Sequence, residues 1–394
     1  MAAHPARPDA EPLTSLANPE VAPMGGAALG AEQVRAPVDL DLEAMEAEAR
    51  RLIGDMAYAY FAGGAEDERL LGDCVAAWAR WQLRPRVLTG VSEVSTATTV
   101  LGAPVATPVL VAPTAIQRLA HPDGEAAMAK GAASAGTCLV LSSLATCPLE
   151  EVAATAPDGL RWMQIYVVRE RARTEELVHR AVEAGYRALV LTVDAPVSGV
   201  RLRELRGGVR LPDDLVLPNL TSGSTKEARG GGFIAVVTGE FEPALTFEDI
   251  GWLHELSGLP VVVKGVLRGD DALRCVEAGA AGVVVSNHGA RQLDDAPATA
   301  DVLDEVVDAV GGRAEVYVDG GIRRAPDVAK ALALGARAVL VGRPTLWALA
   351  TGGAEGVAGL VGWLTAELRR TMALCGASSV AELDRSLVRR TRTP

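Results

Sequence analysis

The segment 286–291, Ser-Asn-His-Gly-Ala-Arg, follows directly on the apolar run 280–285 and carries two reactive side chains. His288 is one of only five histidines in 394 residues, and a neutral imidazole can accept a proton near pH 7. Arg291 lies three positions further on, and its planar guanidinium can hold a carboxylate through two parallel hydrogen bonds. Together they could bind an anion and abstract a proton from it.

Five other apolar runs also end in polar side chains. These are Gln164 and Tyr166, Thr192 and Asp194, Lys264, Asp319, and Arg343. In a parallel barrel the carboxyl ends of all strands lie on one rim, where active sites form. One polar strand end is as readily explained by contact with solvent, but six successive strands with this pattern indicate a functional site.

Short apolar runs recur along the chain and alternate with alanine-rich helical segments. The runs span 108–113, 138–143, 161–167, 187–194, 260–265, 282–289, 315–321 and 337–343. Helical segments such as 174–185, 269–279 and 325–335 lie between them, and each ends in glycine, as helix C-termini commonly do. Eight strand–helix units predict an α/β fold of the (β/α)₈ TIM-barrel type rather than an open doubly wound sheet.

The segments on either side of the predicted strands, and one long loop between them, lack the regular alternation of strand and helix. Apolar residues at helical spacing begin after Asp41, and Gly63-Gly64 ends this pattern, which predicts a cap helix before the barrel. We expect a disordered or loosely attached tail at 1–38, a barrel at 39–380 with a mobile lid loop at 211–245 after the fourth strand, and a C-terminal tail at 381–394.

Composition excludes several classes of function. The chain has 38 basic and 50 acidic residues, a net charge of −12, which disfavours nucleic acid because phosphate backbones need a basic face. No apolar run approaches the roughly 20 residues that span a membrane, and the N-terminus lacks the apolar core of a signal peptide. Five cysteines without paired spacing predict free thiols in a reducing compartment and no metal site. We therefore expect a cytoplasmic protein that binds neither membranes nor nucleic acid.

Two glycine-bearing turns follow the last two predicted strands. They are 318–324, with Arg323, and 340–344, with Arg343. Glycine lets backbone N–H groups approach a phosphate closely, and phosphate sites in barrels commonly lie after strands seven and eight. The sequence has no GxGxxG after a strand and no GxxxxGK[ST], so neither a dinucleotide fold nor a P-loop is indicated.

The segment SNHGARQLD strongly resembles the active-site signature of the FMN-dependent 2-hydroxy-acid oxidizing enzymes, which include glycolate oxidase, lactate oxidase and mandelate dehydrogenase. The resemblance extends from about Ala57 to Leu374 through YFAGGAEDE, APTA, LSSLAT, QIYV, LTVDAP, VVVKGV and DGGIRR. It implies an FMN cofactor, oxidation of a small (S)-2-hydroxy acid to the 2-oxo acid, O2 as electron acceptor with H2O2 as product, and a homotetramer or octamer.

The resemblance also implies roles for individual residues. His288 would be the base, Asp194 its partner, and Tyr166 a donor to the substrate hydroxyl; Tyr60, Arg201 and Arg291 would bind the substrate carboxylate. The cofactor-binding residues would be Pro113, Thr114, Ala115, Ser142, Gln164, Thr192, Lys264, Ser286, Asp319, Gly321, Arg323, Gly342 and Arg343. Among these, Lys264 would lie beside the flavin ring and stabilise its reduced, anionic form.

One position departs from glycolate oxidase and bears on the substrate. Leu144 stands where that enzyme carries a bulky tryptophan, and Ile116, Ser198 and Val200 would line the rest of the pocket on the same mapping. This favours a substrate larger than glycolate, with an aryl or medium-length chain. A dehydrogenase that uses a quinone or another acceptor, a decarboxylating monooxygenase, an FMN isomerase of prenyl diphosphates and a non-catalytic flavin-binding barrel remain alternatives.

Overall fold

The computed structural model describes residues 40–208, 212, 215–220 and 239–391. Eight parallel strands close into a barrel in the order β10-β11-β4-β5-β6-β7-β8-β9. They are β4 (Val109–Val111), β5 (Leu139–Leu141), β6 (Arg161–Ile165), β7 (Leu189–Thr192), β8 (Val261–Val266), β9 (Gly282–Val285), β10 (Glu315–Val318) and β11 (Ala338–Val341). Seven strands lie within the predicted runs and β8 extends one residue beyond its run, so the predicted TIM barrel is confirmed.

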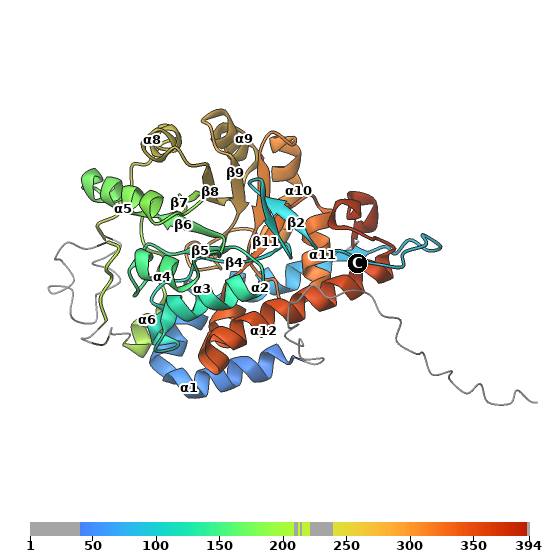
Figure 1. The fold of residues 1–394 in the computed structure, drawn as a ribbon, viewed down its shortest axis with the longest axis horizontal. Coiled ribbons are helices and arrows are strands. Elements are labelled where there is room, and N and C mark those ends of the chain that lie inside the picture. The colour runs from blue at the N-terminus through green and yellow to red at the C-terminus, as the bar shows by residue number, and fades with distance from the viewer. Residues whose placement is uncertain (1–39, 209–211, 213–214, 221–238, 392–394) are drawn as a thin grey trace, which may run out of the picture. The chain divides into compact units, whose positions relative to one another are not determined.

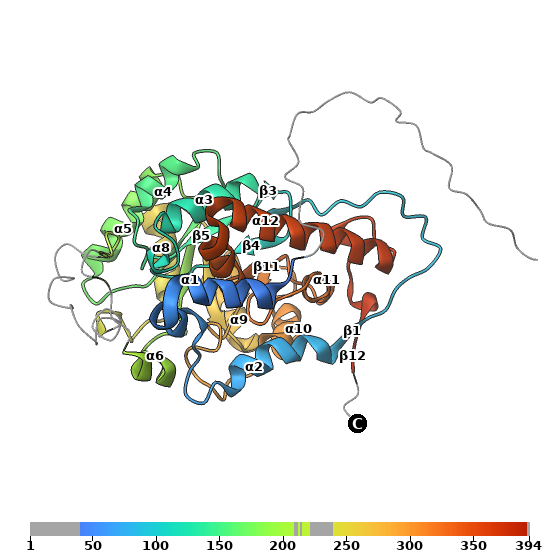
Figure 2. The same cartoon turned by 90° about the horizontal axis from the view of Figure 1, so that it is seen from below.

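A helix follows every barrel strand and packs on the outside of the barrel (Figures 1 and 2). In chain order these are α3 (Gly124–Ser134), α4 (Leu149–Thr155), α5 (Arg171–Glu183), α8 (Glu248–Ser257), α9 (Gly269–Glu277), α10 (Thr299–Val310), α11 (Ala325–Ala333) and α12 (Arg343–Cys375). Strand residues alternate between this outer layer and the barrel interior, where Trp162 and Tyr317 meet edge to face with ring centroids 5.5 Å apart.

Elements from the N-terminal part of the chain pack against the barrel. The hairpin of β2 (Thr98–Val100) and β3 (Ala103–Val105) adds Val100 and Val105 to the apolar cluster inside the barrel. The cap helix α1 (Leu42–Ala62) begins after Asp41, whose side chain accepts hydrogen bonds from two backbone N–H groups, and ends at Gly63 as predicted. It runs beside α12, where Tyr58 and Trp347 have ring centroids 5.5 Å apart.

Several elements carried no clear signal in the sequence. These are α2 (Arg69–Ala76), α6 (Leu202–Gly207), the short 3₁₀ helices η1 (Ala77–Arg80), η2 (Gln117–Leu119), η4 (Val380–Glu382) and η5 (Arg385–Leu387), and the strands β1 (Trp81–Leu83) and β12 (Val388–Arg390). β1 and β12 form an antiparallel pair, so the segment predicted as a C-terminal tail, 381–394, contains a strand attached to the rest of the fold. The predicted tail at 1–38 and most of the predicted lid loop at 211–245 lie outside the described residues.

Two further features concern the cysteines and the hydropathy of the helices. All five cysteines are buried and unpaired. Within the described ranges, no helix is long and apolar enough to cross a membrane.

Candidate active site

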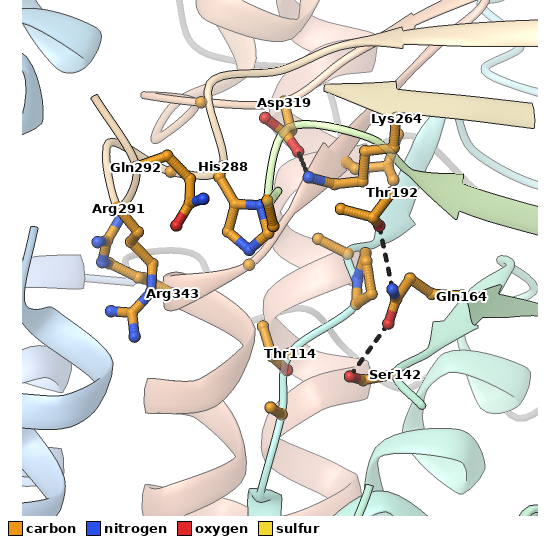
Figure 3. Close-up of a pocket in the computed structure, with 18 of the residues that line it drawn as sticks. Thr114, Ser142, Gln164, Thr192, Lys264, His288, Arg291, Gln292, Asp319 and Arg343 are labelled. Atoms are coloured by element: carbon orange, nitrogen blue, oxygen red, sulfur yellow. Dashed lines mark hydrogen bonds and ion pairs between the residues drawn. The ribbon is translucent and has the colours of Figure 1, made fainter. Parts of the chain in front are cut away.

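One pocket opens at the carboxyl ends of the barrel strands and collects the predicted site residues (Figure 3). Every predicted catalytic, substrate-binding and cofactor-binding side chain lines it except Asp194 and Ser286. Those two lie one contact further out: Asp194 accepts a hydrogen bond from His288, and Ser286 bonds to both Lys264 and Asp319. Residues up to about 280 positions apart in the sequence are thus brought to one rim by the parallel strands.

His288 is held between a carboxylate and a phenol. Its Nδ1 lies 2.8 Å from Oδ1 of Asp194, and its Nε2 lies 3.3 Å from the hydroxyl of Tyr166. The backbone at His288 has φ of 58°, and Gly289 and Ala290 continue in the same left-handed region. A non-glycine residue in this region costs about 1–3 kcal/mol, which is often found where a side chain must be aimed into a site. The Asp194 contact fixes Nδ1 as the protonated nitrogen and leaves Nε2 free to accept a proton.

Asp194 is a buried carboxylate that remains ionised. Burial raises its pKa, but the charge and the hydrogen bond of His288, together with Lys264, outweigh burial and leave the pKa below its ordinary value. Gly265 on β8 makes this placement possible, because an added Cβ there would lie 2.5 Å from Cγ of Asp194. Gly265 lies in the motif VVVKGV, but this close approach leaves no pattern in the sequence.

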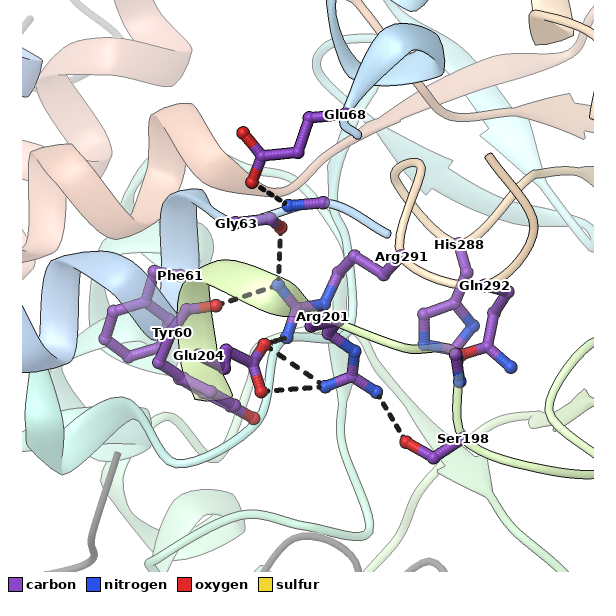
Figure 4. Close-up of polar contacts among 12 residues, drawn as sticks. Tyr60, Phe61, Gly63, Glu68, Ser198, Arg201, Glu204, His288, Arg291 and Gln292 are labelled. Carbon is purple, nitrogen blue, oxygen red and sulfur yellow. Dashed lines mark hydrogen bonds and ion pairs between the residues drawn. The ribbon is translucent and has the colours of Figure 1, made fainter. Parts of the chain in front are cut away.

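Two arginines form a cationic clamp beside His288 (Figure 4). Arg291 donates from Nη1 to the carbonyl oxygens of Tyr60 and Gly63, each at 2.8 Å, and its guanidinium lies over the Tyr60 ring. Arg201 donates to the hydroxyl of Ser198 at 3.1 Å, and its buried Nε has no hydrogen-bond partner. A buried donor without a partner is rare in folded proteins, and this one fits an anion bound from the pocket.

Aromatic side chains enclose the pocket on the side of Tyr166. Phe241 stacks on the Tyr166 ring, with centroids 4.2 Å apart and planes 14° from parallel. Burial and the nearby charge of Asp194 raise the pKa of Tyr166, so its hydroxyl stays protonated and can donate a hydrogen bond. Phe241 falls within the predicted lid loop 211–245, where the residue pattern indicates no contact with Tyr166.

A chain of polar side chains crosses the pocket at the ends of β5, β6 and β7 (Figure 3). Ser142 donates to Oε1 of Gln164 at 3.3 Å, and Nε2 of Gln164 donates to Thr192 at 3.0 Å. On the next strand, Lys264 lies 3.1 Å from Asp319. Burial lowers the pKa of Lys264, but the carboxylates of Asp319 and Asp194 outweigh it and raise the pKa above its ordinary value. A fixed ammonium and a row of amide and hydroxyl groups match the polar edge of a flavin ring.

A second group of residues in the pocket fits a phosphate and a polyol. Arg323 and Arg343 are partly buried cations, and neither forms an ion pair with a carboxylate of the described residues. Gly321, with φ of 73°, allows its turn to pack so closely that an added Cβ would overlap the carbonyl oxygen of Cys74. Oδ1 of Asp319 is buried without a hydrogen-bond partner, so it is available to accept a hydrogen bond from a ligand hydroxyl. These residues fit the phosphate and ribityl groups of FMN.

The predicted substrate end of the pocket is only partly as expected. Leu144 and Ser198 line it, together with Ala195 and Val197. Ile116 does not, because its side chain is 1% exposed in the core, and Val200 does not, because it is half exposed outside the pocket. Both assignments followed the family mapping, which fixes sequence position but not side-chain direction.

Gln292 lies in the segment SNHGARQLD, and only the structure reveals its role. Its amide donates to the carbonyl oxygens of Asp194 and Val197 at 2.8 and 2.9 Å, and accepts from the backbone of Gly199. It therefore ties the segment that follows β7 to the segment that carries His288. An amide pointing at a distant loop leaves no pattern in the sequence.

Comparison with known proteins agrees with this geometry. The chain matches the family of FMN-dependent dehydrogenases over residues 49–390. It is 46% identical to 2-hydroxyacid oxidase 1 of Homo sapiens over 88% of this chain and 95% of that protein, and 49% identical to an L-lactate oxidase of Nostoc sp. over 89% and 98%. Among solved structures, a mandelate oxidase with (S)-4-hydroxymandelic acid superposes with a TM-score of 0.85 and 42% identity over 89% of this chain and 99% of that one.

The family match covers the whole barrel, and the pocket holds the groups that FMN requires. The chain therefore belongs to the family of FMN-dependent dehydrogenases, the FMN-dependent oxidoreductases that include these 2-hydroxy-acid oxidases.

Proposed function

We propose that this protein oxidises an (S)-2-hydroxy acid larger than glycolate to the 2-oxo acid and passes the electrons to O2, which becomes H2O2. The observation that carries the proposal is the pairing of His288 with Asp194 at 2.8 Å, opposite the clamp of Arg201 and Arg291 in one pocket. The names of the relatives support it, because those proteins are oxidases of 2-hydroxy acids.

The residues divide the reaction between them. Arg201 and Arg291 bind the substrate carboxylate, and Tyr166 donates to the hydroxyl oxygen and thereby directs the substrate toward Nε2 of His288. Nε2 takes up a proton from the substrate, and the Asp194 carboxylate stabilises the imidazolium that forms. FMN, when bound, supplies the two-electron acceptor that the oxidation requires.

The size of the substrate follows from Leu144. Leucine adds an apolar surface to the pocket and occupies less space than the tryptophan of glycolate oxidase. Each methylene buried there is worth about 0.8 kcal/mol, or about fourfold in kcat/KM. Aryl and medium-chain 2-hydroxy acids are therefore the proposed substrates.

The test is anaerobic reduction of the bound flavin by glycolate, (S)-lactate, (S)-2-hydroxyoctanoate and (S)-mandelate, followed by mixing with O2. We expect bleaching that is fastest with the larger acids, and one H2O2 for each O2 consumed. Bleaching that persists in O2 and is reversed by a quinone would show a dehydrogenase, and release of CO2 would show a decarboxylating monooxygenase. No bleaching with any acid would refute the proposed function.

We also propose, from the resemblance, that the protein is a cytoplasmic homotetramer or octamer. Light scattering of the purified holoenzyme tests the oligomeric state: a monomer at micromolar concentration would contradict it.

A further inference from the structure

Glu204, in the first turn of α6, lies between the two arginines of the clamp (Figure 4). Its carboxylate accepts from Nη2 of Arg291 at 2.8 Å and from Nη1 of Arg201 at 3.2 Å. The side chains of Glu204 and Arg201 are only 9% and 10% exposed, so the three charges interact in a poorly solvated place. The contact is therefore stronger than an ion pair on the protein surface.

The position of Glu204 decides how much charge the clamp presents. Two buried guanidinium groups repel each other: burial lowers the pKa of Arg291, and the charge of Arg201 lowers it further, while Glu204 opposes both. Glu204 offsets one of the two positive charges. Of the other ionisable groups near the clamp, His288 pairs with Asp194 and Lys264 with Asp319. Arg343 donates to the same Gly63 carbonyl oxygen as Arg291 and has no carboxylate partner among the described residues, so its charge would be neutralised by the phosphate of FMN in the holoenzyme.

Few donors of the two arginines remain for a ligand. Arg201 keeps its unpartnered Nε, and both hydrogens of Arg291 Nη1 are held by the backbone of Tyr60 and Gly63. With one net positive charge and this limited set of donors, the clamp matches a single carboxylate group.

We propose that Glu204 sets the net charge of the clamp to that of one carboxylate, and that it thereby selects monocarboxylic over dicarboxylic 2-hydroxy acids. The inference rests on the proposed function, because it assigns the clamp to the substrate carboxylate. Glu204 is a positioning residue on this account: it acts through the arginines and does not touch the substrate.

The test compares two acids that differ by one charge, (S)-malate and (S)-2-hydroxybutyrate. In the wild-type holoenzyme we expect kcat/KM for malate to be lower by about 100-fold, since every cation near the second carboxylate is already paired with Glu204, with Asp319 or with the FMN phosphate. Glu204→Gln should raise the malate to 2-hydroxybutyrate ratio by about tenfold, because a charge is removed within several ångströms of the bound acid. Loss of positioning alone would lower kcat/KM for both acids and leave their ratio unchanged.

Two control variants separate charge from other effects. Glu204→Asp keeps the charge but shortens the side chain. It should therefore lower kcat/KM for both acids and leave the malate to 2-hydroxybutyrate ratio within about threefold of the wild type. Glu68→Gln removes a nearby carboxylate that pairs with Arg203 rather than with the clamp, and it should also leave the ratio unchanged.

A binding measurement makes the result independent of turnover. Oxalate, a dianion, and pyruvate, a monoanion, are titrated into the oxidised holoenzyme, and Kd is read from the flavin absorbance. Glu204→Gln should shift the Kd ratio in favour of oxalate by about tenfold.

Each outcome decides a different point. An unchanged ratio in Glu204→Gln, in kinetics and in binding, overturns the proposal for Glu204. If that variant fails to hold FMN, equal use of malate and 2-hydroxybutyrate by the wild type overturns it instead. Failure of the wild type to oxidise any 2-hydroxy acid overturns the proposed function alone, because the oxalate and pyruvate titrations still test the charge of the clamp.

Discussion

Arg343 is a partly buried cation whose desolvation is unfavourable until the cofactor binds. Its Nε donates to the carbonyl oxygen of Phe61 at 3.0 Å and its Nη2 to that of Gly63 at 2.9 Å, but no carboxylate of the described residues pairs with it. Burial, with the charges of Arg291 and Arg323, lowers its pKa from its ordinary value to about 9. Replacing it with methionine should therefore stabilise the apoprotein while it weakens FMN binding.

The size of the effect follows from these contacts. A pKa lowered to about 9 corresponds to at most about 5 kcal/mol of destabilisation of the charged form at neutral pH. This penalty is full below about pH 9 and disappears as the pH rises toward the unfolded value, because only the protonated form carries it. Loss of the two hydrogen bonds costs about 2 kcal/mol, so Arg343→Met should gain about 1–3 kcal/mol, or a Tm rise of about 2–6 °C for the apoprotein.

Calorimetry of the apoprotein tests the predicted gain in stability, and a fluorescence titration with FMN tests the predicted loss of affinity. FMN should bind at least about 100-fold more weakly to Arg343→Met, because a charge-assisted contact with phosphate is worth about 3 kcal/mol. Arg343→Lys is the matched control: it keeps a buried charge and should not raise the Tm. A lower apoprotein Tm in Arg343→Met, or an unchanged Kd for FMN, would refute the reasoning.

Four further predictions concern the reaction and its substrate. His288→Ala should leave FMN bound and slow anaerobic flavin reduction by about 10²–10⁴-fold; reduction at the wild-type rate would remove His288 from the role of base. Arg291→Lys should raise KM and lower kcat together, because a point charge cannot replace a planar, bidentate group, so a change in KM alone counts against a clamp that acts in the transition state. Lys264→Met should weaken sulfite binding to the flavin and lower its reduction potential, and unchanged sulfite titrations would contradict a role beside the ring. Leu144→Trp should reverse the order of kcat/KM between mandelate and glycolate, whereas an unchanged order would show that position 144 does not set specificity.

The barrel could be predicted from the sequence because its signals are local. A strand buried on both faces is a short apolar run, and a parallel barrel places the residue that follows each run on a common rim. His288, Lys264 and Asp319 could therefore be assigned to one site before any contact was known. The cap helix was predicted for the same reason, since Asp41 and Gly63 mark its two ends within the sequence itself.

Contacts between distant segments were beyond such reasoning. β1 and β12 have three residues each and pair across some 300 positions, so neither alone differs from an exposed extended segment. Glu204 lies in the charged run RLRELR, which is typical of a solvated surface. Only the fold shows that Arg291, from another part of the barrel, lies against it and makes it part of the site.

The two basic ends of the pocket differ in a way that matches their ligands. Arg323 and Arg343 have no carboxylate partner among the described residues, and the phosphate of FMN carries nearly two negative charges at neutral pH. Arg201 and Arg291 share Glu204, and a monocarboxylic substrate carries one negative charge. If each end is neutralised only by its own ligand, a phosphate in the clamp would leave a buried charge unpaired, and a carboxylate at the phosphate end would leave a cation unpaired. On the proposed function, the placement of one glutamate would therefore distinguish the arginines that bind the substrate from those that bind the cofactor phosphate.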